Sequence, residues 1–238
     1  MTIRQRFELV RREIEAAAIQ SGRTPEDVRL VVVTKGQPLD SVREVVDAGA
    51  KWLGENYPEQ AIQKILALKE FDDVEWHMIG HLQSRKVEIV CAYFSMMHSM
   101  DRLELARKME KELAKSGKVL PILLEINIGQ EATKSGWHVG TPEEIKKLFG
   151  DVQEIAQLGH LKIQGIMAMP PLVENPVSIE ENFRHVGHIK QILNAEFPNL
   201  CWKELSMGTS SDYIPAIKAG ATIVRIGNAI MGPRSYNK

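Results

Sequence analysis

The sequence of 238 residues contains little cysteine and no excess of charge of one sign. Its two cysteines, Cys91 and Cys201, are too few and too far apart for a disulfide framework or a zinc ribbon, so we expect reduced thiols. The 30 basic and 31 acidic residues leave a formal net charge of −1, which gives little attraction to a phosphate backbone and argues against a nucleic-acid partner. No cluster of His, Cys, Asp and Glu has the spacing of metal ligands.

Long apolar runs are also absent. No stretch approaches the roughly 20 apolar residues that a membrane span needs. The first 20 residues are charged every few positions and lack the apolar run of a signal peptide. We therefore expect a soluble cytoplasmic protein with no membrane partner.

What the sequence does contain is a regular alternation of short apolar runs and amphipathic segments. Before it, an apolar stripe at helical spacing predicts an N-terminal helix that includes Ile3, Phe7, Val10, Ile14 and Ala17. Eight strands are then predicted, at Arg29–Lys35, Lys51–Asn56, Glu75–Gly80, Tyr93–His98, Val119–Asn127, Leu161–Ala168, Cys201–Ser206 and Ala221–Ile226. The helices between them are predicted at Leu39–Ala48, Pro58–Leu68, Ser84–Val90, Arg102–Ser116, Pro142–Leu158, Ile179–Phe197 and Asp212–Ala219.

This alternation predicts an α/β fold with a parallel sheet, and eight units are the number that closes a (β/α)₈ barrel of the TIM type. A doubly wound open sheet is the alternative, but it usually has fewer strands and a glycine-rich turn after the first. Here the first strand ends in TKGQP rather than GxGxxG. No linker divides the chain, so we expect one domain over residues 1–238.

Functional side chains in such a barrel lie at the carboxyl ends of the strands. Lys35 ends the first strand and shares a face with Val31 and Val33 by the strand period of two. If that face points into the barrel, its apolar surroundings favour the uncharged amine, which is a nucleophile toward an aldehyde. A solvated lysine at a strand end is the ordinary alternative.

The segments after the seventh and eighth strands have the composition of anion-binding loops. In LSMGTSSD (205–212), hydroxyl side chains surround Gly208, which lets backbone N–H groups approach a ligand before a helix begins. In VRIGN (224–228), Gly227 and Asn228 open a second short helix. Barrels often bind phosphate with the loops after these two strands. Ordinary helix capping by serine and aspartate is the alternative.

The amine and the anion loops would be neighbours, because strand eight adjoins strand one in a closed barrel. Such a site fits a ligand with an aldehyde at one end and a phosphate at the other, which describes pyridoxal 5′-phosphate (PLP). Arg225 lies within the eighth strand, and an inward arginine needs a partner because an unpaired buried charge is costly. The pyridine nitrogen of PLP or a carboxylate would serve.

The motifs that carry these residues are similar to those of the pyridoxal phosphate homeostasis protein family, which resembles the N-terminal barrel of alanine racemase. The resemblance spans nearly the whole chain, with the motifs in matching order and spacing. They are VVVTKGQP (31–38), GENYPEQ (54–60), WHMIGHLQSRK (76–86), HSMDR (98–102), EINIGQEATKSGW (125–137), IQGIMAMPP (163–171), LSMGTSSD (205–212) and VRIGNAIMG (224–232).

The resemblance implies that Lys35 holds PLP as a Schiff base and that Arg225 faces the pyridine nitrogen. An arginine there keeps that nitrogen unprotonated, because two cations repel. The family pattern implies that the phosphate is held by Ser206, Ser210, Gly227 and Asn228. It implies that the ring is lined by Asn56, His77 and Met207.

Some positions depart from the family pattern. The family usually has proline where this sequence has His81, and a polar residue where it has Gly36. Asn228 stands where serine or threonine is more usual, and Gly129-Gln130-Glu131 replaces an acidic, serine-containing stretch. These departures bear on the shape of the pocket rather than on the cofactor.

Alanine racemase needs a base on each face of its substrate, and its second base comes from an additional β-domain. This sequence ends at Lys238, soon after the eighth strand, so we expect no such domain. The resemblance therefore implies a monomeric PLP carrier or buffer in intracellular PLP homeostasis, without clear turnover and with PLP-accepting apo-enzymes as candidate partners.

The sequence also fits two other functions. The first is a PLP-dependent, racemase-like enzyme that acts on an amino acid, with His77, His81 or a tyrosine as the second base. A surface or capping role is the ordinary alternative for His81. The second is a Schiff-base aldolase without PLP, against which the place of the lysine on the first strand counts.

Overall fold

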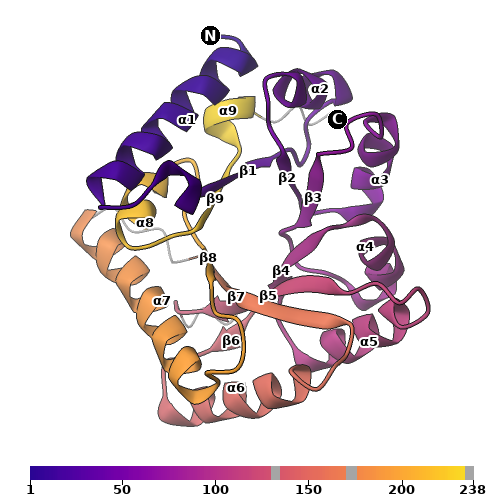
Figure 1. Cartoon of the computed structure of the whole chain (residues 1–238), viewed down its shortest axis with the longest axis vertical. Coiled ribbons are helices and arrows are strands. Elements are labelled where there is room, and N and C mark those ends of the chain that lie inside the picture. Colours follow the sequence, from indigo (N-terminus) through magenta and orange to yellow (C-terminus); the bar gives the residue numbers. More distant parts are fainter. Residues whose placement is uncertain (130–134, 170–175, 234–238) are drawn as a thin grey trace.

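The computed structural model describes residues 1–129, 135–169 and 176–233. Its strands form a closed ring with helices around the outside (Figure 1). Hydrogen-bonded neighbours follow the order β4-β3-β2-β1-β9-β8-β7-β5, and pairing of β5 with β4 closes the ring. The strands, all paired in parallel, are β1 (Arg29–Val33), β2 (Trp52–Glu55), β3 (Glu75–Met78), β4 (Met96–Met100), β5 (Leu120–Asn127), β6 (Trp137–His138), β7 (Leu161–Ala168), β8 (Glu204–Ser206) and β9 (Ile223–Ile226).

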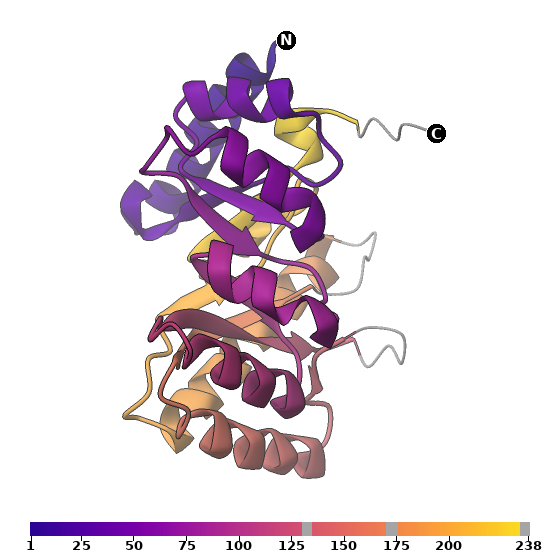
Figure 2. The ribbon, with the colours of Figure 1, turned by 90° about the vertical axis from the view of Figure 1, so that its right-hand side faces the viewer.

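The helices follow the strands in alternation and succeed one another along the outer wall (Figure 2). They are α1 (Ile3–Gln20), α2 (Leu39–Asp47), α3 (Pro58–Ala67), α4 (Val87–Tyr93), α5 (Leu103–Leu113), α6 (Pro142–Ile155), α7 (Pro176–Glu196), α8 (Tyr213–Lys218) and α9 (Asn228–Met231), with short 3₁₀ turns η1 (Pro25–Asp27) and η2 (Ser84–Lys86). The predicted (β/α)₈ barrel is confirmed, and its closure excludes the open sheet. Within the described ranges, no helix combines the length and apolar composition that crossing a bilayer requires.

The extra N-terminal helix α1 lies against the outside of the barrel, where it packs on α2, α8 and α9. Thr2 begins it with a capping box, in which its hydroxyl accepts from the N–H of Gln5 and its own N–H donates to the Gln5 side chain. The predicted apolar stripe is confirmed, because its buried residues are Ile3, Phe7, Val10, Ile14, Ala17 and Ala18.

Side chains of the strands alternate between two cores. Val31 points into the barrel and Val32 points outward into the large core between strands and helices, and both are 0% exposed. The apolar cluster inside the barrel is small and consists of Val31, Met96, Leu123, Met167 and Ile223, with Trp52 packed against it. Polar side chains therefore fill much of the remaining interior.

The structure differs locally from the prediction in several places. The fourth strand, predicted over Tyr93–His98, begins at Met96, because α4 buries Val90 and Cys91 and continues to Tyr93. The seventh strand begins at Glu204 rather than at Cys201, and the short β6 is not predicted. Both cysteines are free, with Cys91 buried and Cys201 half-buried.

Candidate functional site

A cavity of about 500 Å³ lies at the carboxyl ends of the barrel strands. Residues that follow or end β1, β2, β3, β5, β7, β8 and β9 contribute to its wall. Six of the nine predicted site residues line it, namely Lys35, Asn56, Ser210, Arg225, Gly227 and Asn228. The loops after the first, seventh and eighth barrel strands therefore meet at one place, as the sequence predicts.

The other three predicted residues lie outside this lining. His77 and Ser206 are fully buried in the barrel interior, beneath the cavity. Met207 follows Ser206 in the chain, points to the opposite side and is buried in the outer apolar core. Direct contact of these three with a cofactor stays a prediction.

Lys35 lies in the turn that follows β1, where it is half-buried and lines the cavity with Val33. Val31 belongs to the cluster inside the barrel, so the face that these residues share points inward. Gly36 has φ +68°, the left-handed conformation that favours glycine. The departure from a polar residue at this position therefore suits the turn that carries Lys35.

A buried ion pair of Lys64 and Glu55 holds the backbone just after the end of β1. Lys64 Nζ donates to Glu55 Oε1 at 2.7 Å and to the carbonyl oxygen of Thr34 at 2.8 Å. The hydroxyl of Thr34 donates to the same carboxylate at 2.7 Å. Because Thr34 precedes Lys35, these contacts hold the backbone from which the lysine extends.

Ser210 lies where two backbone N–H groups converge. Its hydroxyl oxygen accepts from the N–H of Gly227 and from the N–H of Ala229, each at 3.2 Å. The loop that carries it is closed by Asp212, whose carboxylate accepts from the N–H of Thr209 at 2.6 Å and from its hydroxyl at 2.9 Å. Because the two N–H groups donate to the serine oxygen, they orient it, and its own hydroxyl proton can be donated to an anion in the cavity.

Arg225 extends from β9 toward the cavity and is only 4% exposed. Its Nη1 donates to Ser206 Oγ at 2.6 Å and its Nη2 donates to the carbonyl oxygen of Ala168 at 3.2 Å. Burial lowers the pKa of the guanidinium to about 10, while Glu125 and Asp212 act to raise it. The guanidinium is therefore a cation at neutral pH.

Glu125 is a cavity residue that the sequence does not single out. Burial raises the pKa of its carboxyl to about 7, Asp101 adds to the rise, and Arg225 opposes it. Within the described part of the chain, Glu125 Oε2 and Asn56 Oδ1 are buried oxygens without a hydrogen-bond partner. The signal that could have found Glu125 is the strand period of two, which places it with Leu123 inside the barrel.

His81 also lines the cavity and is paired with a buried carboxylate. Its Nδ1 lies 2.6 Å from Asp101 Oδ2 and 3.0 Å from Ser135 Oγ. The Asp101 side chain is 3% exposed and contacts Arg102 Nη1 at 2.5 Å as well. The stretch 130–134, which includes part of the Gly129-Gln130-Glu131 departure, lies outside the described residues.

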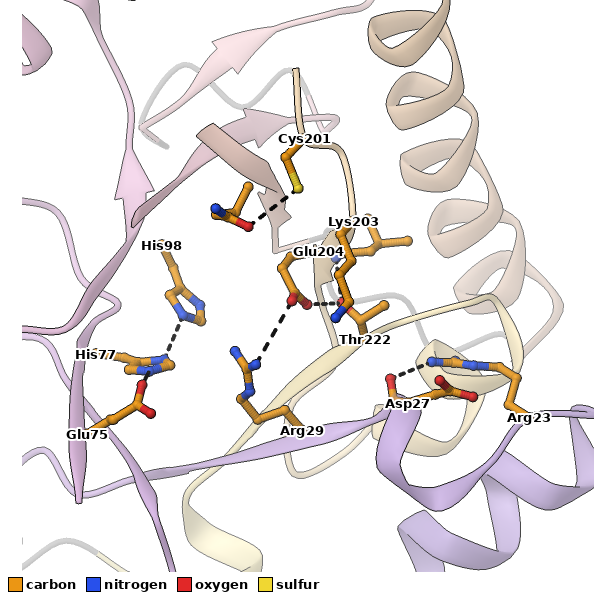
Figure 3. Close-up of polar contacts among 12 residues, drawn as sticks. Arg23, Asp27, Arg29, Glu75, His77, His98, Cys201, Lys203, Glu204 and Thr222 are labelled. Carbon is orange, nitrogen blue, oxygen red and sulfur yellow. Dashed lines mark hydrogen bonds and ion pairs between the residues drawn. The ribbon is translucent and has the colours of Figure 1, made fainter. Parts of the chain in front are cut away.

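A second cavity, of about 790 Å³, opens at the amino ends of the strands and holds none of the predicted site residues. The buried Glu204 in its wall accepts from Thr222 at 2.7 Å and lies 4.0 Å from Arg29 (Figure 3). The Arg29 guanidinium also stacks over the ring of Trp52, at 5.1 Å from its centroid. These polar groups are partners of one another. Six of the nine predicted site residues line the smaller cavity instead.

Comparison with known proteins agrees with this arrangement. The family described as "Alanine racemase, N-terminal domain" matches residues 14–235. A pyridoxal phosphate homeostasis protein of Aquifex aeolicus is 37% identical over 232 residues, which are 98% of this chain and 98% of that protein. The pyridoxal phosphate homeostasis protein of Escherichia coli K12 is 36% identical over 231 residues, which are 96% of this chain and 95% of that protein.

Solved structures give the same result. PipY of Synechococcus elongatus, with PLP bound, has a TM-score of 0.82 and 29% sequence identity, covering 97% of this chain and 100% of that one. Alanine racemase of Clostridium difficile has a TM-score of 0.71 at 12% identity, covering 98% of this chain and 58% of that one, and shows the fold alone.

The fold and the family match thus define an alanine racemase N-terminal-domain barrel. Within that class, the chain belongs to the pyridoxal phosphate homeostasis protein family.

Proposed function

We propose that this protein binds PLP in the cavity of about 500 Å³ and acts in the cytoplasm as a monomeric carrier or buffer of PLP, without catalytic turnover. The observation that carries the proposal is the convergence of Lys35, Ser210 and Arg225 on one cavity. The PLP-bound structure of PipY, a neighbour of the same fold and length, supports it.

Each residue has a role that follows from its chemistry. Lys35 forms a Schiff base with the aldehyde of PLP, in which the C=N bond forms and water leaves. Ser210 donates its hydroxyl proton to the phosphate, and the N–H groups of Gly227 and Ala229, which donate to Ser210 Oγ, hold that hydroxyl in place. Arg225 donates toward the pyridine nitrogen and keeps it unprotonated, so the ring accepts electrons less readily than it would beside a carboxylate.

The cavity fits this ligand on grounds of its own. Asn56 Oδ1 and Glu125 Oε2 are buried in its wall without hydrogen-bond partners among the described residues. Buried polar atoms of this kind are costly unless a ligand or water satisfies them. A polar aromatic ligand in this cavity supplies partners, for example through the ring hydroxyl of PLP.

The test is titration of the protein with PLP, monitored by visible absorption. Wild-type protein should develop the yellow band of a Schiff base, and Lys35→Met should lose that band because no amine remains at this place in the cavity. Lys69→Met is the matched control, since Lys69 is an exposed lysine outside the cavity. A Lys35→Met protein that forms the band as wild type does would overturn the assignment of Lys35.

A second candidate function, proton exchange on an amino acid in the manner of a racemase, is favoured by the pairing of His81 with Asp101. A buried carboxylate on Nδ1 orients a histidine ring and leaves Nε2 to accept a proton. Bound PLP would take up the electron pair of the broken Cα–H bond. His81 would accept that proton, and a proton returned to Cα would complete the exchange.

This second candidate is tested by NMR of L-alanine in D₂O with the PLP-loaded protein. The racemase-like function predicts α-proton exchange faster than with free PLP, and a loss of about 100-fold in His81→Ala, the scale of one general base. Lys69→Met again controls for an unrelated surface change. Exchange no faster than with free PLP would exclude this candidate and leave the carrier.

A further inference from the structure

A line of buried polar side chains crosses the barrel interior beneath the cavity. His77 on β3, His98 on β4 and Ser206 on β8 are each 0% exposed. His98 Nε2 lies 3.0 Å from His77 Nδ1, and His98 Nδ1 lies 3.0 Å from Ser206 Oγ. Arg225 donates to the same serine oxygen at 2.6 Å. The line therefore ends on a guanidinium that forms part of the cavity wall.

These side chains occupy positions that apolar residues could fill. Met96, two residues before His98 on the same face of β4, belongs to the apolar cluster inside the barrel. Ile223, two residues before Arg225 on the same face of β9, belongs to this cluster as well. Polar groups buried in such surroundings reduce stability unless every one is hydrogen-bonded. A set of them in one continuous line indicates a function beyond filling space.

Arg225 fixes the direction of the hydrogen bonds. A guanidinium can only donate, so Ser206 Oγ accepts from Arg225. Among the described residues, His98 Nδ1 is the acceptor within hydrogen-bond distance of the serine's own proton, so Ser206 donates to His98 Nδ1. The proton of the His98 ring then lies on Nε2 and is donated to His77 Nδ1. His77 in turn carries its proton on Nε2, a buried atom that has no hydrogen-bond partner among the described residues.

The far end of the line agrees with this direction. His77 Nε2 lies 3.6 Å from Glu75 Oε2, a carboxylate at the amino end of β3 whose side chain is 53% exposed (Figure 3). The opposite direction would point a lone pair of His77 at that carboxylate. Burial lowers the pKa of both histidine rings. The Glu75 carboxylate opposes this shift at His77, and the neighbouring His77 ring and the charge of Arg225 add to it at His98. Burial therefore favours the neutral ring at both positions.

We propose that His98 and His77 are positioning residues of the cavity, which act through Ser206 to hold the Arg225 guanidinium against its ligand. This inference rests on the proposed PLP function. It also assigns a role to His77 and Ser206, which the sequence places at the site and the structure places one layer below it. Neither histidine is among the residues that line the cavity, so each acts through the line.

The first test needs no cofactor. ¹⁵N NMR of the imidazole nitrogens in the full-length protein without PLP should show both rings neutral, each with its proton on Nε2. A proton on Nδ1 of His98, or a charged ring at pH 7, would overturn the line as drawn. This measurement on the wild-type chain decides the matter even if variants in the barrel interior fail to fold.

The second test compares PLP binding by three variants, each of which is first checked for folding by thermal melting. His98→Leu leaves Ser206 without its acceptor, so the Kd for PLP should rise about tenfold, the equivalent of one unsatisfied buried group. The absorption band of bound PLP should shift as well, because the charge beside the ring moves. His98→Gln keeps an amide that can accept and donate, and should recover most of both properties. Met96→Leu is the matched control inside the same barrel.

The outcomes separate this inference from the function on which it rests. A wild-type protein that does not bind PLP would contradict the proposed function itself. A wild-type protein that binds, with a folded His98→Leu variant of unchanged Kd and band, would overturn only the positioning role. Equal losses in His98→Leu and Met96→Leu would also overturn it, because packing alone would then explain the effect.

Discussion

At the scale of single residues, the cavity balances one buried cation against one buried carboxyl. Arg225 keeps its charge because Ser206 Oγ and the carbonyl oxygen of Ala168 accept hydrogen bonds from its guanidinium. The carboxylates of Glu125 and Asp212 also act to raise its pKa. Among the described residues Glu125 Oε2 has no hydrogen-bond partner, and burial raises the pKa of the Glu125 carboxyl to about 7. The protonation of Glu125 therefore changes within the physiological range, and its proton is bound more tightly in the folded protein than in the unfolded chain.

Stability should depend on pH through this residue. Because the folded-state pKa of Glu125 is raised from 4.5, its stabilising contribution is complete below pH 4.5 and is lost as pH rises through about 7. Glu125→Gln removes this loss, so the variant should be about 1–3 kcal/mol more stable than wild type at pH 8 and near wild type at pH 4.5. Urea unfolding without PLP at the two pH values measures the difference.

The exposed Glu88→Gln is the control for removal of one carboxylate outside the cavity. A gain for Glu125→Gln that is the same at both pH values would show that its carboxyl does not titrate in this window. No gain at pH 8 would contradict the burial argument.

The two residues that the sequence identifies most directly lie on predicted strands or at their ends. Lys35 and Arg225 follow from the strand period and from the ends of predicted strands. Glu125, His98 and Asp101 are not singled out from the sequence. The strand period places Glu125 on the inward face of β5 with Leu123, but Glu125 lies two residues before the end of that strand. The late start of β4 places His98 at mid-strand. The pairing of Asp101 with His81 depends on the fold, which brings the two side chains together.

At the scale of elements, the connection from β8 to α8 shapes the anion loop. Gly208 has φ +94°, and a Cβ there would lie 2.6 Å from the Cβ of Ala216 on α8. The close approach places Ser210 beside Gly227 at the start of the next connection. The loop therefore depends on a glycine for both its backbone and its packing.

Gly208→Ala should destabilise the protein by about 1–3 kcal/mol and weaken PLP binding, because backbone strain and a steric clash displace the loop. Gly117→Ala is the matched control, since Gly117 has φ +69° with no atom within 4 Å of an added Cβ. It shares the backbone strain without the clash. Thermal melting and PLP titration of both variants distinguish them, and equal affinity for PLP in the two would contradict the role of this loop.

The order of elements could be predicted almost completely, because β-branched runs and helical stripes alternate without interruption. The boundaries could not. Around Tyr93, an apolar segment satisfies both the strand and the helix pattern, and packing of Val90 and Cys91 decides for the helix. The two-residue β6 depends only on pairing with the end of β5, which no local pattern reveals.

At the scale of the whole molecule, closure of the barrel assembles the site. Pairing of β1 with β9 places Val31 beside Arg225. Lys35 follows β1 and Gly227 follows β9, so both come after the paired ends of these strands. The residues lie almost 200 positions apart in the sequence, yet the fold class alone predicts that they meet. The interior line through His98 could not be predicted in this way, because it needs the register of strands on opposite sides of the ring.

We propose that this barrel holds PLP on Lys35, and trapping of the adduct is the most direct experiment. The protein is incubated with PLP, reduced with borohydride and digested, and the modified peptide is identified by mass spectrometry. We expect one phosphopyridoxyl group on Lys35, with the yellow band lost on reduction. A protein that takes up no PLP, or an adduct on another lysine while Lys35 stays unmodified, would contradict it.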